Sequence, residues 1–186
     1  MKHLILFIII TFSFLNCNYI SKAENKKNEN LFEKKLGKKF FDYDEIDYYS
    51  TNFEEEKISD LHYNKSKSKL DSIKIGVILK NIPKNISDLS FIQNLELIGY
   101  NKSIVDKSKF NDIDKIFVEK SVEEYSVTSC IHIYRDILIF KKENKVVGTA
   151  KICFECLDAQ ITGTKAVTEN FGQNGDYKKL ETILKK

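Results

Sequence analysis

The chain has little of several residue types, and each shortage excludes a class of protein. It has no tryptophan, one proline and seven glycines among 186 residues, a composition far from that of a collagen-like chain. Four cysteines are too few for a disulfide-dense scaffold. The formal net charge is only +3, which argues against a nucleic-acid groove. With 42% hydrophobic residues, the chain has enough apolar surface for a globular core and is not largely disordered.

Common catalytic motifs are absent as well. The sequence contains no P-loop, dinucleotide-binding fingerprint, His-Glu-x-x-His or Gly-x-Ser-x-Gly pattern. Beyond the first residues, only His62 and His132 offer an imidazole. These absences favour a non-enzymatic binding or interaction module, with a protein as one possible partner and no nucleic acid among its partners.

What the chain does have at its start is an export leader. A short basic beginning, Met1–His3, is followed by an apolar run over residues 4–15. That run has the length of a signal-peptide core and is shorter than the roughly 20 residues that a membrane-spanning helix needs. We therefore expect residues 1–16 to be a signal peptide.

Cys17 follows this run directly, after Asn16. A cysteine in this position resembles the lipobox of bacterial lipoproteins, although Asn16 stands where Gly, Ala or Ser is commoner. The resemblance implies that Cys17 is the lipid attachment site. It also implies that the protein is exported and anchored in the bacterial cell envelope, facing the periplasm or the exterior. The alternatives are a plain cleaved signal peptide and a retained weak anchor.

The rest of the chain divides into a tether and one domain. Residues 17–30 are dominated by Asn, Ser, Lys and Glu and predict a flexible tether. We assign residues 31–186 to a single α+β domain. Its first part predicts a short helix over 31–40 and then an acidic, tyrosine-rich stretch over 41–49, which we interpret as a solvated edge or, alternatively, a surface for a cation or a partner.

Alternating and helical patterns predict the remaining elements. We expect strands at 72–79 and 97–100, and between them a short helix capped by Ser87 or Asp88. Residues 130–140 and 146–154 predict a β-hairpin, and the chain ends in a helix with Asp176 at its N-cap. The fold class is therefore α+β, with an antiparallel sheet, a C-terminal cysteine-containing β-hairpin and a terminal helix.

The hairpin brings the other three cysteines together. If Asn144 is the centre of a three-residue turn, His132 faces Cys156, and Cys130 is a diagonal neighbour of Cys156 on one sheet face. A two-residue turn would shift the register and invert the faces. The proximity of these residues survives this ambiguity, but the detailed pairing does not.

Three interpretations of this cluster remain open. The first is a structural disulfide between Cys130 and either Cys153 or Cys156, as suits an oxidising compartment. The second is a zinc site formed by Cys130, His132, Cys153 and Cys156; zinc is the alternative to having no cofactor. The third is thiol redox chemistry at the Cys-x-x-Cys spacing of residues 153–156, which lacks the surrounding βαβ pattern of thioredoxin-like proteins.

Arg135 is the only arginine in the chain. Because a guanidinium group offers a planar fork for a carboxylate or phosphate, Arg135 is a candidate anion-binding residue beside the cysteines. The alternative is an ion pair with a nearby Asp or Glu on the surface.

Overall fold

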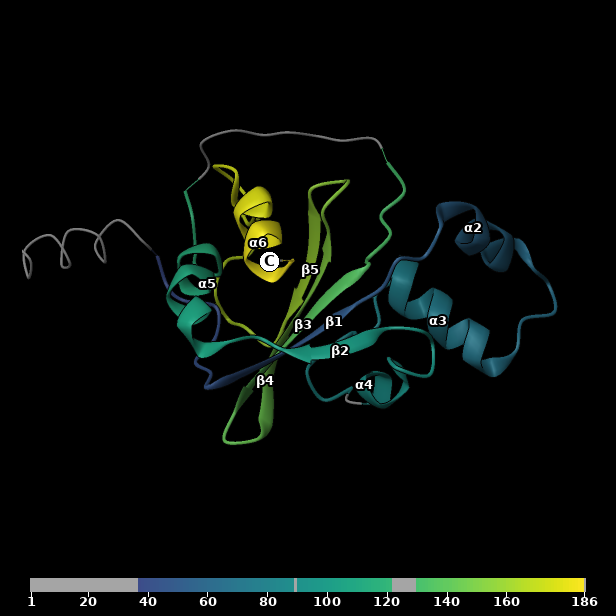
Figure 1. Cartoon of the computed structure of the whole chain (residues 1–186), viewed down its shortest axis with the longest axis horizontal. Coiled ribbons are helices and arrows are strands. Elements are labelled where there is room, and N and C mark those ends of the chain that lie inside the picture. Colours follow the sequence, from purple (N-terminus) through teal and green to yellow (C-terminus); the bar gives the residue numbers. More distant parts are fainter. Residues whose placement is uncertain (1–36, 89, 122–129, 186) are drawn as a thin grey trace, which may run out of the picture. The chain divides into compact units, whose positions relative to one another are not determined.

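Five antiparallel strands form one sheet in the order β2-β1-β3-β4-β5 within the described part of the chain (Figure 1). The computed structural model describes residues 37–88, 90–121 and 130–185. The strands are β1 (Glu45–Ser50), β2 (Asn101–Ile104), β3 (Asp136–Lys142), β4 (Lys145–Cys153) and β5 (Asp158–Thr162). The helices are α2 (Glu55–Tyr63), α3 (Lys69–Leu79), α4 (Ser90–Asn94), the 3₁₀ turn η1 (Lys107–Lys109), α5 (Phe110–Ile116) and α6 (Asp176–Leu184).

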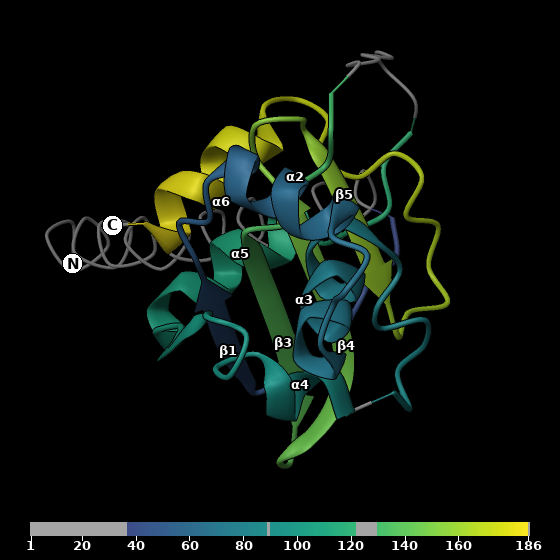
Figure 2. The ribbon, with the colours of Figure 1, turned by 90° about the vertical axis from the view of Figure 1, so that its right-hand side faces the viewer.

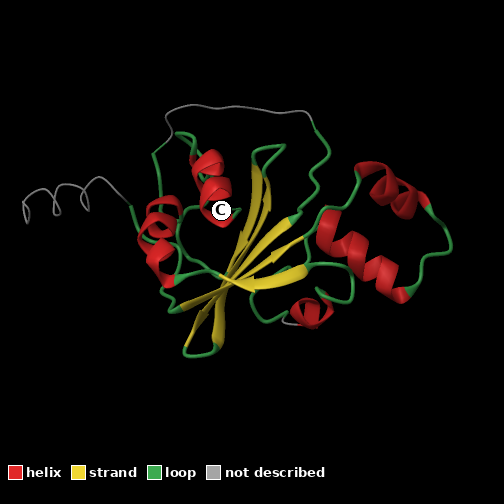
Figure 3. Ribbon diagram, in the orientation of Figure 1, coloured by secondary structure: helices red, strands yellow, loops and turns green. Residues whose placement is uncertain are grey.

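Helices cover both faces of this sheet, as Figure 3 shows by secondary structure. Helices α5 and α6 pack on one face, and α2, α3 and α4 pack on the other; in Figure 2 these three lie in front of the strands. Strand β3 lies at the centre, and its residues Ile137 to Phe140 are fully buried because alternate side chains enter the two cores. The predicted α+β class, antiparallel sheet, C-terminal hairpin and terminal helix are confirmed.

The hairpin has the register that was expected for a three-residue turn, but its turn is of a different type. Its turn has two residues, Glu143 and Asn144, both with positive φ (49° and 62°). An irregularity between Phe140 and Lys141 then shifts the register by one residue, so that Phe140 pairs with Gly148. The net result is the pairing that a three-residue turn would give. The first strand is shorter than predicted, because residues 130–135 precede β3 without joining it, whereas the second, Lys145–Cys153, has the predicted length.

The expected strand at 72–79 is wrong, because these residues belong to helix α3. A capping box starts the helix: the Ser68 side chain accepts from the Asp71 N–H at 3.1 Å, and Asp71 accepts from the Ser68 N–H at 3.2 Å. The helix packs against α2, α4 and the sheet, so apolar residues occur on more than one of its sides. That distribution imitates the alternation of a strand.

Three other local expectations need correction. Residues 97–99 belong to a turn, and the strand begins only at Asn101. The stretch over 41–49 is no solvated edge, since β1 lies between β2 and β3 with Ile46–Tyr49 buried. Most of the helix expected over 31–40 lies outside the described residues, and Phe40, which is described, is not helical but packs in a core.

Several expectations about the start of the chain concern residues that the structure does not describe. The unit that the described residues build begins at Lys38. The expected leader and the expected tether, with Cys17, lie outside the described residues. The short helix expected after Ser87 or Asp88 is present as α4, and Asp88 accepts from the Ser90 hydroxyl at 2.9 Å.

Candidate functional site

The predicted cysteine cluster forms at one end of the sheet, where β4 ends and β3 begins. Cys130 lies in the segment before β3, and Cys156 lies in the turn between β4 and β5. The two are joined by a disulfide with a Cα–Cα distance of 6.0 Å, although 26 positions separate them in sequence. Cys153 keeps a free thiol, is buried, and packs with Tyr134 and Cys156.

His132 belongs to the same cluster. Among the described residues, one group of three side chains has the composition of a metal site, namely Cys130, His132 and Cys156, with their ligand atoms all within 4.8 Å of one another. Cys153 is not part of this group. Cys130 is exposed, His132 is intermediate and Cys156 is buried, so the group is open to solvent on one side.

Asp158, the first residue of β5, supports the histidine. Its Oδ2 lies 3.2 Å from Nδ1 of His132 and accepts a hydrogen bond from the Tyr134 hydroxyl at 2.5 Å. Burial, reinforced by this bond to Asp158, raises the pKa of Tyr134, which therefore stays a neutral donor. The Tyr134 hydroxyl therefore holds the Asp158 carboxylate, and this carboxylate in turn orients the imidazole of His132.

Lys151 lies behind this network in β4 and is fully buried. Its Nζ donates to the carbonyl oxygens of Val77 (2.7 Å) and Lys80 (2.5 Å) at the C-terminal end of α3. The same nitrogen lies 4.5 Å from the centre of the Tyr134 ring. Burial lowers the pKa of Lys151 to about 7. Sequence reasoning missed this residue; its one visible sign was a lysine inside the apolar run from Ala150 to Cys153.

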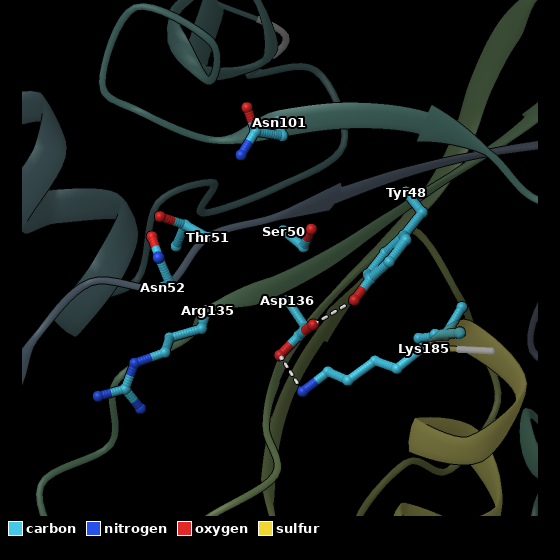
Figure 4. Close-up of a pocket in the computed structure, with 9 residues that line it drawn as sticks. Tyr48, Ser50, Thr51, Asn52, Asn101, Arg135, Asp136 and Lys185 are labelled. Atoms are coloured by element: carbon cyan, nitrogen blue, oxygen red, sulfur yellow. Dashed lines mark hydrogen bonds and ion pairs between the residues drawn. The ribbon is translucent and has the colours of Figure 1, made fainter.

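Arg135 lies on the wall of a separate pocket with a volume of about 400 Å³ (Figure 4). Its guanidinium donates through Nε to the Phe53 carbonyl at 2.8 Å and through Nη1 to Glu155 at 2.5 Å. The expected alternative, an Arg–Glu pair, is thus present, and the arginine also borders a cavity. The pocket is lined by Tyr48, Ser50, Thr51, Asn52, Asn101, Arg135, Asp136, Leu184 and Lys185.

Asp136 is the acidic group of this pocket. The Tyr48 hydroxyl donates to its Oδ1, and Nζ of Lys185 lies 3.7 Å from its Oδ2. Figure 4 shows these three side chains together, with the Arg135 side chain directed to the other side. Burial raises the pKa of the Asp136 carboxyl, while the hydrogen bond from Tyr48 and the charge of Lys185 oppose that rise.

A second hollow of about 540 Å³ lies between the start of β5 and the loop before α6. Gly172, Asn174 and Gly175 in this loop have positive φ, which gives the turn that the glycines predicted. Asp158 and Tyr177 line its inner side. Its polar groups are mostly those of the loop itself.

No family model, curated protein or solved structure matches this chain. Over residues 37–88, 90–121 and 130–185, no helix has the length and apolar content needed to cross a bilayer. The site must therefore be interpreted from its own geometry.

Proposed function

We propose that the protein is an exported, lipid-anchored, non-enzymatic binding module of the bacterial cell envelope, and that its pocket at Arg135 holds a small ligand with a carboxylate or phosphate group. The observation that carries the binding proposal is one cavity lined by the only arginine, by Lys185 and by the polar side chains of Ser50, Thr51, Asn52 and Asn101; the Arg135 side chain is directed to the side away from Lys185 (Figure 4). The leader and Cys17 support the location.

The charges of the pocket favour an anion. Arg135 and Lys185 bring two positive charges, and the pocket contains one acidic side chain, Asp136. That carboxyl accepts from Tyr48 and faces Lys185, which also pairs with Glu181 at 3.1 Å, so a ligand anion would bind mainly through Arg135. The hydroxyl and amide groups of Ser50, Thr51, Asn52 and Asn101 add hydrogen-bond donors that a ligand oxygen can use.

Glu155 indicates how a ligand would approach the guanidinium. Its side chain is 68% exposed, whereas that of Arg135 is only 18% exposed. Because the glutamate is exposed to solvent, its ion pair with Arg135 contributes little to stability, typically about 0–1 kcal/mol, and an incoming carboxylate can displace it. The Nε contact to Phe53 then keeps the guanidinium in place during the exchange.

A thermal unfolding assay with small anions tests this proposal. We expect at least one of acetate, succinate, glutamate, inorganic phosphate and glycerol phosphate to raise the unfolding temperature of the full-length protein, because a ligand that binds only the folded state stabilises it. Arg135→Gln should abolish the shift. Arg135→Lys should retain less than half of it, because lysine keeps the charge and loses the fork.

Glu155→Gln is the matched control. It removes the carboxylate that competes for Nη1 and leaves the pocket side chains in place. The affinity of the stabilising anion should rise in this variant. If none of the five anions shifts the unfolding temperature, or if Arg135→Gln responds like the wild type, the binding proposal is wrong.

A further inference from the structure

The anion pocket leaves the group formed by Cys130, His132 and Cys156 unexplained. A structural disulfide needs only the two cysteines. It does not account for an imidazole whose ring nitrogen lies within 4.8 Å of both sulfur atoms. Nor does it account for a carboxylate placed to orient that imidazole.

We infer that these three residues form a redox-gated metal site, which binds Zn²⁺ when the cysteines are reduced and releases it when they join as a disulfide. Two thiolates and one imidazole are a ligand set that zinc prefers. In a tetrahedral site with ordinary Zn–S and Zn–N bonds, neighbouring ligand atoms lie roughly 3.3–3.8 Å apart. The imidazole nitrogen lies at most 4.8 Å from each sulfur, about 1 Å beyond this range, whereas the two sulfur atoms are bonded and must move apart; side-chain rotations can supply both changes once the disulfide is reduced.

The surroundings of His132 match those of a metal-binding histidine. Such a histidine usually donates its second ring N–H to a carboxylate, which fixes the ring and its tautomer. Here Nδ1 of His132 lies 3.2 Å from Asp158, so a proton on Nδ1 leaves the lone pair on Nε2 for the metal. The Tyr134 hydroxyl donates to the same carboxylate oxygen and holds it in place.

Solvent access distinguishes this site from a buried structural zinc centre. The His132 side chain is 40% exposed and Cys130 is exposed, so the metal has an entry path and its fourth position is open to water. Cys153 is 1% exposed and packs behind Cys156, and we assign it no metal bond. The site therefore has three protein ligands rather than the four that residue spacing suggested.

The gating reaction is an ordinary thiol–disulfide exchange. A dithiol reductant transfers two electrons and two protons to the Cys130–Cys156 disulfide; the S–S bond breaks, two thiols form, and the reductant becomes a disulfide. Zn²⁺ then binds as the two thiols release their protons. An oxidised dithiol partner reverses the sequence and expels the metal.

Zinc titration of the full-length protein in both redox states tests the inference. With Zn²⁺ alone as the probe and a chromogenic chelator as competitor, we expect one equivalent to bind after reduction and none to the oxidised protein. Zinc should also raise the unfolding temperature of the reduced form only. If the reduced protein binds no zinc, or if the oxidised protein binds it equally well, the inference is wrong.

Variants that leave the disulfide intact separate a metal site from a general effect of thiols. His132→Gln should weaken zinc binding at least about tenfold, and Asp158→Asn by about 10–100-fold, because an outer carboxylate of this kind is worth that much. Cys153→Ser is the matched control and should bind as the wild type does. Folding of each variant is checked in the oxidised form. Binding that depends on Cys153 but not on His132 would overturn the assignment.

Discussion

Lys151 occupies an environment that is unusual for a lysine. Every atom of the side chain is buried, and its nitrogen satisfies two carbonyl oxygens at the end of α3, those of Val77 and Lys80. A neutral amine still has two N–H donors for these two acceptors, so the hydrogen bonds do not require the charge. Burial disfavours the charged form and lowers the pKa of Lys151 to about 7, while the charge of Asp158 opposes this.

This shift predicts a specific dependence of stability on pH. The pKa of Lys151 is about 7 in the folded protein and near the usual 10.4 when unfolded. Between these values the unfolded chain binds more protons, so the free energy of unfolding rises with pH, by up to about 1.4 kcal/mol per unit. Urea unfolding at pH 7, 8 and 9 should show this rise.

Lys151→Met is the comparison variant. We expect it to be less stable than the wild type, because the carbonyl groups of Val77 and Lys80 lose their donor. Its unfolding free energy should lack the rise between pH 7 and 9 that the wild type shows. Equal pH dependence in the two proteins would show that Lys151 is not the group that titrates.

At the scale of elements, the β3–β4 turn holds a glutamate in a backbone conformation that few residue types adopt readily. Glu143 and Asn144 both have positive φ, a conformation that costs most L-residues about 1–2 kcal/mol and that asparagine tolerates better. The backbone N–H of Glu143 also donates to Asp44 at 3.0 Å, and a substitution keeps this bond.

Glu143→Asn should therefore stabilise the protein by roughly 0.5–1 kcal/mol. Asn144→Val should destabilise it, because a β-branched residue fits a left-handed conformation poorly. Chemical denaturation of both variants measures the two effects against the wild type. If Glu143→Asn lowers the denaturation midpoint, the turn does not have this geometry.

The elements that sequence patterns predicted share one property: they depend on local contacts. The hairpin and α6 follow from periodicity and turn residues within a short window, and both were predicted, although the N-cap of α6 is Gly175 and Asp176 is its first helical residue. Helix α3 was missed because it is apolar on several sides, a consequence of where it packs. The role of β1 as an inner strand depends on its pairing with β3, some 90 positions away.

The candidate sites also differ in whether local sequence patterns could predict them. The approach of Cys130 to Cys156 followed from the hairpin alone, because one turn brings both residues to the same end. The place of Asp158 depends on β5, which was not predicted. The pocket of Arg135 needs Tyr48 from β1 and Lys185 from beyond α6, and no local pattern links these segments.

At the scale of the whole molecule, the disulfide cross-links a long segment. Closing a loop of 26 positions stabilises the fold by about 3–4 kcal/mol in the chain-entropy account. Reduction in the absence of metal should therefore lower the urea midpoint of the wild type. The double variant Cys130→Ala/Cys156→Ala should show the same low midpoint with or without reductant, and Cys153→Ala should still respond to it. A wild-type midpoint that reduction leaves unchanged would contradict this.

The proposed anchor predicts a covalent lipid at one residue. In a bacterial host, radiolabelled palmitate should attach to the wild-type protein, because the lipobox-like sequence ends at Cys17. Cys17→Ser should carry no label, and Cys130→Ser should be labelled like the wild type. Label that persists in Cys17→Ser would refute the lipoprotein assignment.

Binding at Arg135 is the central claim, and its single arginine permits the most direct measurement. Protein labelled with ¹⁵N-arginine should give one side-chain Nε–Hε cross-peak, whose hydrogen bond to the Phe53 carbonyl slows exchange with water. We predict that adding the anion found by thermal unfolding shifts this peak in a saturable way. The shift should be larger at equal anion concentration in Glu155→Gln. A peak that does not move while the anion stabilises the protein would place the ligand elsewhere and contradict the account.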